Sequence, residues 1–237
     1  MKSRHDSAGK SLGIGPHTGR TSVARRLARL VIPRGIRRRL GRLGEWLVPL
    51  SPARVYQNRA ILPRIARRGG TVLLVGCRRY TAHEPKRLER HGVVCWTLDI
   101  DPDVVRWGAP QRHITASIEQ ATSHFSAATF DTVVLSGVFG FGVNEIAGQE
   151  AAIAACAVIL KPGGLLVLGW NSDLVADPSM LTEVKRNFDT PSDPELVERV
   201  TFRRSTHVFD FHTRRAWARV AAFVWVTSEP VSELLVS

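Results

Sequence analysis

The residues best placed to do chemistry stand where two short apolar runs end. The first run, residues 72–75, stops at Gly76, and the second stops at the carboxylate of Asp99. An apolar strand that breaks at a glycine, with an acid about 20 residues later, is typical of nucleoside binding in doubly wound α/β proteins. There the glycine allows close approach of the backbone, and the acid accepts hydrogen bonds from ribose hydroxyls. The spacing therefore predicts a site for a nucleoside-containing cofactor.

The elements that would position these residues follow from the apolar pattern. Short apolar runs are expected to form strands that are buried on both faces, with helices between them. This alternation predicts an α/β fold with a doubly wound, mostly parallel sheet. The expected strands are residues 71–75, 93–98, 113–115, 130–136, 165–170, 207–211 and 221–227, and the expected helices are 82–91, 102–107, 145–160 and 178–188.

Positive charge is concentrated near the N-terminus. Residues 1–70 hold 17 lysines and arginines against two acids, whereas the whole chain has a net charge of +12. We therefore divide the chain into a basic, partly disordered arm (1–50) and an α/β domain (51–237). Residues 21–48 alternate basic and aliphatic side chains, which predicts short amphipathic helices that contact an anionic membrane or cover the flank of the domain. Nucleic acid is a less favoured partner of the arm.

Several classes of protein do not fit the composition. The three cysteines are scattered without metal-ligand spacing, so no metal site is expected. No apolar run approaches the ~20 residues that a membrane-spanning helix needs. The start of the chain lacks the apolar segment of a secretory signal. We expect a cytoplasmic protein whose basic arm makes a peripheral membrane contact.

Three segments in order give residues 71–171 a resemblance to the class I S-adenosylmethionine-dependent methyltransferases. Residues 72–80 resemble the glycine-rich first motif of that family, and residues 97–102 resemble the end of its second strand. Residues 130–134 and the Leu-Lys-Pro-Gly-Gly turn at 160–164 resemble its fourth strand and the entry to its fifth. The resemblance implies a Rossmann-like methyltransferase fold, S-adenosyl-L-methionine as the cofactor, and methyl transfer to an acceptor that it does not name.

The first motif departs from the pattern of the family. That pattern has an acid and three glycines, but here only Gly76 remains, and Arg78 and Tyr80 occupy two glycine positions. One explanation is that Arg78 or Arg79 pairs with the carboxylate of the methionine part of the cofactor. The other is that cofactor binding is lost and only the fold remains. We favour retained binding, because Asp99 is present.

The resemblance also implies which residues contact the cofactor. They follow the expected strands, and Asp99 would bind the ribose while Ile100 packs against adenine. Ser117 is the polar residue nearest to the position where the family often has an acid for the adenine amino group. The full set is Gly76, Cys77, Arg78, Asp99, Ile100, Ser117, Ser136 and Gly137.

Substrate residues are expected where the fourth and fifth strands end. Phe139 belongs to an aromatic, glycine-interleaved loop that either lines an acceptor pocket or packs on the core. Asn171 and Asp173 either orient or deprotonate an acceptor or cap a turn. No catalytic residue is assigned, because methyl transfer from a sulfonium depends mainly on positioning.

The leading hypothesis is a methyltransferase that acts on a small or membrane-associated acceptor. The alternative is a catalytically inactive, methyltransferase-like module whose basic arm binds nucleic acid or an anionic membrane. A nicotinamide-dependent oxidoreductase is disfavoured, because a pyrophosphate needs the glycines that are replaced here.

Overall fold

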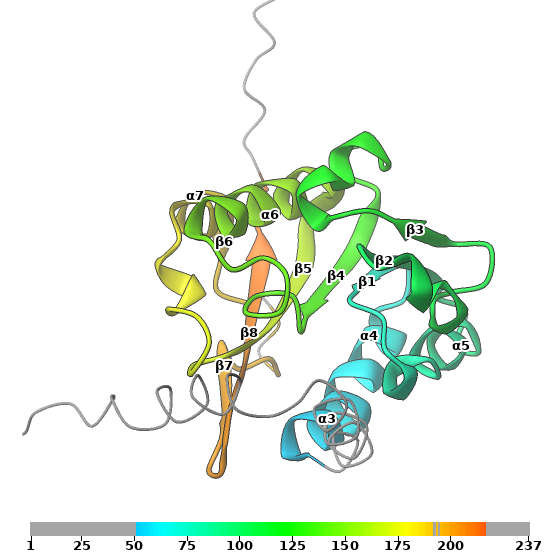
Figure 1. Ribbon diagram of the computed structural model, residues 1–237, viewed down its shortest axis with the longest axis horizontal. Helices are drawn as coiled ribbons and strands as arrows, with labels where there is room; N and C mark the ends of the chain where they lie inside the picture. Colours follow the sequence, from blue (N-terminus) through cyan, green and yellow to red (C-terminus); the bar gives the residue numbers. More distant parts are fainter. Residues whose placement is uncertain (1–50, 192, 194, 217–237) are drawn as a thin grey trace, which may run out of the picture. The chain divides into compact units, whose positions relative to one another are not determined.

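The structure is a computed structural model that describes residues 51–191, 193 and 195–216. Within them, one eight-stranded sheet has the order β3-β2-β1-β4-β5-β8-β6, and β7 pairs with β8 off this path (Figure 1). The strands are β1 (Thr71–Val75), β2 (Val94–Asp99), β3 (His113–Thr115), β4 (Phe130–Ser136), β5 (Leu160–Asn171), β6 (Phe188–Asp189), β7 (Arg199–Phe202) and β8 (Ser205–Arg214).

The sheet is mostly parallel, and it is wound outward from its middle. Strand β1 pairs in parallel with both β2 and β4, and β3 and β5 extend the two sides in parallel. The strands β6, β7 and β8 add an antiparallel edge. The chain thus reverses its winding direction between β1 and β4, and ligands of doubly wound sheets bind beside such a point, at the carboxyl ends of the strands.

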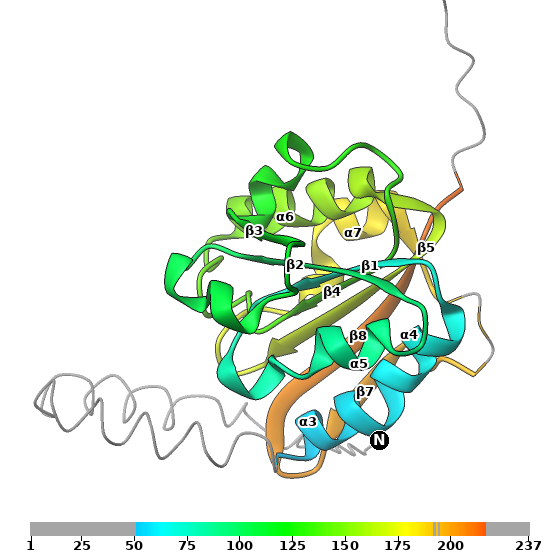
Figure 2. The same ribbon diagram turned by 90° about the vertical axis from the view of Figure 1, so that its right-hand side faces the viewer.

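Helices cover both faces of the sheet. Figure 2 shows α6 (Ile146–Ile159) and α7 (Thr182–Asn187) on one face, and α3 (Pro52–Tyr56), α4 (Leu62–Arg68) and α5 (Glu84–Glu89) on the other. A π-helical turn, Gln57–Ile61, joins α3 to α4. Short 3-10 helices span Arg79–Thr81, Pro102–Trp107, Ile118–Ser123 and Pro178–Met180.

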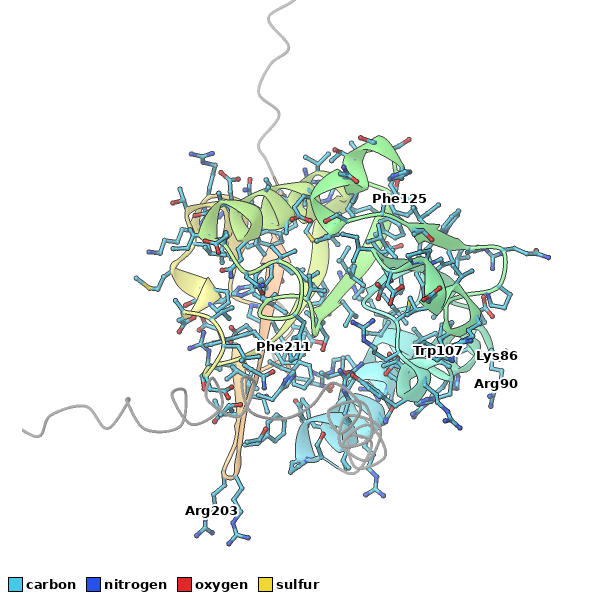
Figure 3. The ribbon with its side chains drawn as sticks, in the orientation of Figure 1. Lys86, Arg90, Trp107, Phe125, Arg203 and Phe211 are labelled. Atoms are coloured by element: carbon cyan, nitrogen blue, oxygen red, sulfur yellow. The ribbon has the colours of Figure 1, made fainter. Side chains whose placement is uncertain are left out.

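The central strands divide their side chains between two apolar cores. Leu73 and Val75 of β1 point into the core beneath α6, whereas Val72 and Leu74 point into the core beneath α4 and α5. This alternation is expected of a strand that is covered on both faces. Three acidic side chains, Glu84, Asp99 and Asp210, are buried. Arg203, in contrast, is exposed, and Figure 3 shows it at the tip of the β7–β8 hairpin directed away from the domain.

The structure confirms the predicted fold class and the central elements, and it corrects several others. The segment 178–188 is a 3-10 turn followed by α7 rather than one helix, and 102–107 is a 3-10 helix. The sequence analysis missed the helical run 52–68, because Pro52 and Pro63 read as breaks. Pro52 occupies the first turn of α3, where the missing N–H costs the helix nothing. Pro63 lies within the run, directly after the π-helical turn 57–61.

Three other expectations fall outside the described residues. They are the arm 1–50, its amphipathic helices at 21–48 and the strand at 221–227. The boundary between the arm and the domain therefore stays a prediction. No helix in the described part of the chain is long and apolar enough to cross a membrane.

Candidate functional site

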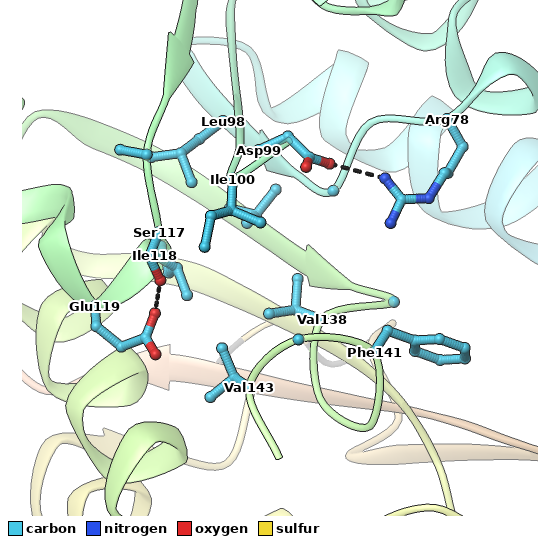
Figure 4. Close-up of a pocket in the computed structure, with 15 residues that line it drawn as sticks. Arg78, Leu98, Asp99, Ile100, Ser117, Ile118, Glu119, Val138, Phe141 and Val143 are labelled. Carbon is cyan, nitrogen blue, oxygen red and sulfur yellow. Dashed lines mark hydrogen bonds and ion pairs between the residues drawn. The ribbon is translucent and has the colours of Figure 1, made fainter. Parts of the chain in front are cut away.

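A cavity opens at the carboxyl edge of the sheet, beside the point where the winding reverses. It has a volume of about 530 Å³, counting its open mouth. Figure 4 shows Ser117 and Glu119 at one end and Arg78 and Phe141 at the other. The lining residues come from the ends of β1 and β2, the segment after β3 and the turn after β4: Val75, Gly76, Arg78, Leu98, Asp99, Ile100, Ala116, Ser117, Ile118, Glu119, Gly137, Val138, Phe141, Gly142 and Val143.

Asp99 forms part of the cavity wall, and its carboxylate is held by three donors. Its side chain is 5% exposed. Oδ2 accepts hydrogen bonds from the Cys77 N–H at 2.6 Å and from Arg78 Nη1 at 3.0 Å, and Oδ1 accepts one from the Asp101 N–H at 2.9 Å. A carboxylate has about four acceptor positions. Two ribose hydroxyls can therefore both bind only if Arg78 moves off Oδ2.

The pair between Arg78 and Asp99 is a contact that the sequence analysis did not foresee. That analysis offered Arg78 or Arg79 as a partner for the methionine carboxylate, whereas here the Arg78 guanidinium pairs with the carboxylate expected to bind ribose. The Arg78 side chain is 39% exposed, so it has room to leave. Its partner Asp99 is buried, so a ligand that displaces Arg78 must itself donate to Oδ2. Ribose hydroxyls can supply such donors.

Gly76 provides the close turn that follows β1. Its φ is +93°, and a Cβ at this position would lie 2.8 Å from the backbone oxygen of Ser136. Any larger residue would strain the turn and collide with the end of β4. Gly76 therefore keeps the role expected of the surviving glycine.

Cys77 contributes its backbone and not its side chain. The Cys77 N–H binds Asp99, while the thiol is buried, 4.0 Å from His113 Nδ1. Burial and the nearby Asp99 raise the pKa of the thiol to about 12. The thiol is thus neutral at physiological pH and is not a nucleophile.

One end of the cavity is apolar with an acid at its rim. Ile100 is exposed at the mouth, and Ile118 is buried behind it. The Ser117 hydroxyl donates to the Glu119 carboxylate, and both side chains line the cavity. The sequence analysis named Ser117 and missed Glu119, although an acid two positions after Ser117 is the signal that would have found it.

The turn after β4 corrects the choice of aromatic residue. Phe139 is 1% exposed and lies in the core beneath α6, so our assignment of it to a substrate was wrong. The N–H groups of Phe141 and Gly142 both donate to the Val138 carbonyl at 3.0 Å, which closes the turn. In this tight turn Phe139 points inward and Phe141 outward, and Phe141 is 58% exposed at the mouth.

Of the other predicted residues, Gly137 lines the cavity, whereas Ser136, Asn171 and Asp173 do not. The Ser136 side chain is buried beside Gly169, and its hydroxyl has no partner within the described structure. Asn171 Oδ1 lies 3.0 Å from His207 Nδ1. Asp173 is exposed just beyond β5. Asn171 and Asp173 thus stand at the carboxyl edge, as expected, while their role toward a substrate stays a prediction.

A buried carboxyl group at the start of α5 gives a testable pH dependence. Glu84 begins α5, is almost fully buried, and accepts a hydrogen bond from Gln57 Nε2 at 3.0 Å. Burial raises the pKa of this carboxyl to about 7 from an ordinary value of 4.5. The folded state therefore holds a proton that the unfolded state releases between these two pH values, so stability falls as the pH rises through this window.

Replacing Glu84 by glutamine is expected to remove this slope, because glutamine does not titrate. At pH 8 the variant should be more stable than the wild type by roughly 3 kcal/mol, the cost of ionising the buried carboxyl. Urea unfolding of both proteins at pH 5 and pH 8 measures the difference. An equal pH slope in the two proteins would contradict the assignment.

The cavity fits an adenosyl group. It combines a buried acid, a turn that only glycine can make, and apolar side chains around an acidic rim. Asp99 would hold the ribose, and Ile100 and Val138 would contact the base. In the described part of the chain, no group of three histidine, cysteine or acidic side chains could hold a metal ion.

Comparison with known proteins identifies a methyltransferase domain in this chain. Residues 73–168 match a family described as a methyltransferase domain. The N-methyltransferase NodS from Bradyrhizobium japonicum WM9, in complex with S-adenosyl-L-homocysteine, is 20% identical with a TM-score of 0.51, covering 69% of this chain and 88% of that chain. The PH0226 protein from Pyrococcus horikoshii OT3 is 14% identical with a TM-score of 0.53, covering 69% and 90%. No curated protein matches the chain.

The similarity to these two structures shows the Rossmann-like fold, and the domain match identifies the protein as a methyltransferase. Residues 73–168 of the chain form a methyltransferase domain. This domain makes the protein an enzyme of methyl transfer, with S-adenosyl-L-methionine as its cofactor.

Proposed function

We propose that the protein transfers a methyl group to a small or membrane-associated acceptor with an apolar part. The observation that carries this proposal is the exposed ring of Phe141 at the cavity mouth. Ile100, which follows β2, is also exposed on the lining of this cavity. Ile146, Leu174 and Met180 are exposed on the segments that follow β4 and β5. Exposed apolar side chains that line a cavity are typical of ligand contacts.

The residues of the chain would act mainly by positioning. The bound cofactor supplies an activated methyl group. Asp99 orients the ribose, and the side chains of Val138 and Phe141 exclude water from the mouth. Holding an acceptor in line with the methyl group supplies most of the rate enhancement in such displacements, without a required acid or base.

Replacing Phe141 by serine is expected to lower transfer to the acceptor about 10-fold or more, the effect of losing a buried phenyl contact. Radiolabelled methyl transfer would be measured with lipid and small-molecule extracts as separate acceptor pools. Val158, exposed on α6 away from the mouth, provides the control variant Val158→Ser. Equal transfer by both variants would contradict the role of Phe141, and no binding of S-adenosylhomocysteine at millimolar concentration would contradict the whole proposal.

We also propose that residues 21–48 bring the enzyme to anionic membranes. Their basic and aliphatic composition supports this contact. Binding to phosphatidylserine vesicles should weaken steeply as salt increases, because surface charge attraction is screened. Deletion of residues 1–50 should abolish this binding, and unchanged binding after the deletion would refute the proposal.

A second candidate function, an inactive binding module, is favoured by one observation. The Arg78 guanidinium occupies one acceptor position of the Asp99 carboxylate, which would otherwise be available to ribose. If Arg78 only competes with a cofactor, Arg78→Ala should bind S-adenosylhomocysteine at least as well as the wild type. If neither protein binds it, the inactive module is supported.

A further inference from the structure

One arginine outside the matched methyltransferase segment lies at the border of the cavity. Arg54 belongs to α3, and its guanidinium carbon lies 4.9 Å from the centre of the Tyr80 ring. Its Nη2 lies 3.9 Å from the position that a Cβ on Gly137 would occupy. Gly137 lines the cavity, and Tyr80 follows the turn after β1. Arg54 therefore stands between the two turns that flank the winding reversal.

Buried groups hold this guanidinium in place. Arg54 Nη1 donates to Gln57 Oε1 at 2.8 Å, and Gln57 Nε2 donates in turn to Glu84 Oε1 at 3.0 Å. The side chains of Gln57 and Glu84 are both buried. A donor fixed in this way loses little conformational freedom when a ligand binds. Arg54 is thus preorganised rather than a mobile surface side chain.

The charge of Arg54 has no direct counter-ion in the part of the chain that the structure describes. Arg54 forms no ion pair within 4 Å in that part, but Gln57 links it to the buried Glu84, and its charge partly offsets the rise in the pKa of Glu84 that burial causes. Arg78, in contrast, is paired directly with Asp99. A guanidinium matches a carboxylate through parallel N–H donors. Arg54 can therefore receive an anionic group that approaches along the Gly137 side of the cavity.

The position of Asp99 indicates which anionic group that is. With ribose on Asp99 and the base toward Ser117 and Glu119, the remaining part of the cofactor extends toward the turns after β1 and β4. We propose that Arg54 binds the α-carboxylate of the methionyl part of S-adenosylmethionine, an inference that rests on cofactor binding in the proposed function. Arg54 would then supply the contact to the cofactor that is lost because Arg78 and Tyr80 replace two glycines of the first motif.

The test compares two ligands that differ by the group in question. S-adenosylhomocysteine carries the α-carboxylate, whereas 5′-methylthioadenosine has the same nucleoside without the amino-acid part. By isothermal titration, Arg54→Gln is expected to lower affinity for S-adenosylhomocysteine about 10- to 100-fold, the range for one charge-assisted hydrogen bond. Its affinity for 5′-methylthioadenosine should stay unchanged, and Arg54→Lys should recover part of the loss.

Two further variants complete the design. Arg59→Gln removes an exposed arginine from the adjoining π-helical turn and should leave both affinities unchanged. Gln57→Leu frees the Arg54 side chain, so it should weaken binding of S-adenosylhomocysteine only. This selective effect would identify Gln57 as a positioning residue, because a general loss of stability would weaken the binding of both ligands.

The outcomes separate this inference from the function on which it rests. Equal losses for both ligands in Arg54→Gln would mean that Arg54 only supports the fold, and would overturn the inference. Unchanged affinity for S-adenosylhomocysteine would also overturn it. If the wild type binds neither ligand, the proposed function itself fails.

Discussion

Replacing Asp99 by asparagine is expected to lower the affinity for S-adenosylhomocysteine by about 100-fold or more. The carboxylate is a buried acid in the cavity wall, and two hydroxyl bonds to a charged acceptor are each worth about 1.5–3 kcal/mol. Asparagine keeps the shape of the side chain but presents one acceptor oxygen and no charge. Isothermal titration with S-adenosylhomocysteine and with 5′-methylthioadenosine should show similar losses, because both ligands carry the ribose.

A matched control lies close in the sequence. Asp103 is exposed in the 3-10 helix that follows β2, and Asp103→Asn changes the net charge by the same amount. Circular dichroism would verify that both variants remain folded. Unchanged binding in Asp99→Asn would mean that the ribose is held elsewhere, and the assignment of this cavity to the cofactor would fail.

Replacing Asp210 by alanine is expected to cause the largest loss of stability, about 3–5 kcal/mol in the free energy of unfolding. Asp210 is 1% exposed and accepts hydrogen bonds from Trp170 Nε1 at 2.7 Å and from Arg199 Nε at 2.5 Å. Arg199 also forms two hydrogen bonds with Asp177, at 2.7 and 2.8 Å. Without Asp210, a buried indole N–H and part of a guanidinium lose their acceptor, and this loss is the physical cause of the effect.

Urea unfolding at pH 7 measures the change. The control is Asp189→Ala, which removes an ion pair with Arg215 in which the Asp189 side chain is 56% exposed. Exposed pairs of this kind contribute at most about 1 kcal/mol. A loss below that value in Asp210→Ala would show that the network between β5, β7 and β8 does not stabilise the fold as described.

Much of the central sheet could be predicted from local patterns. The runs that became β1, β2 and β4 are short and mostly apolar, as expected of strands covered on both faces. The helical run before β1 could not be recognised in this way. Pro52 is compatible with a helix because it lies in the first turn of α3, whereas Pro63 follows the π-helical turn 57–61, which the residue types did not indicate.

The aromatic turn after β4 shows where local reasoning ends. Phe139 and Phe141 are two positions apart, so the sequence offers no reason to prefer one as the exposed ring. The hydrogen bonds that close the turn on the Val138 carbonyl decide that Phe139 enters the core. The choice depends on backbone geometry that residue types do not specify.

The sequence by itself determined the class of fold, the glycine of the first turn and the acid at the end of the second strand. Each depends on neighbours within one strand and its turn, where periodicity and residue type decide the conformation. Only the tertiary structure decided that Arg78 pairs with Asp99 and that Arg54 faces Gly137. The second contact joins residues far apart in the chain, and long side chains on different elements meet only when packing brings those elements together.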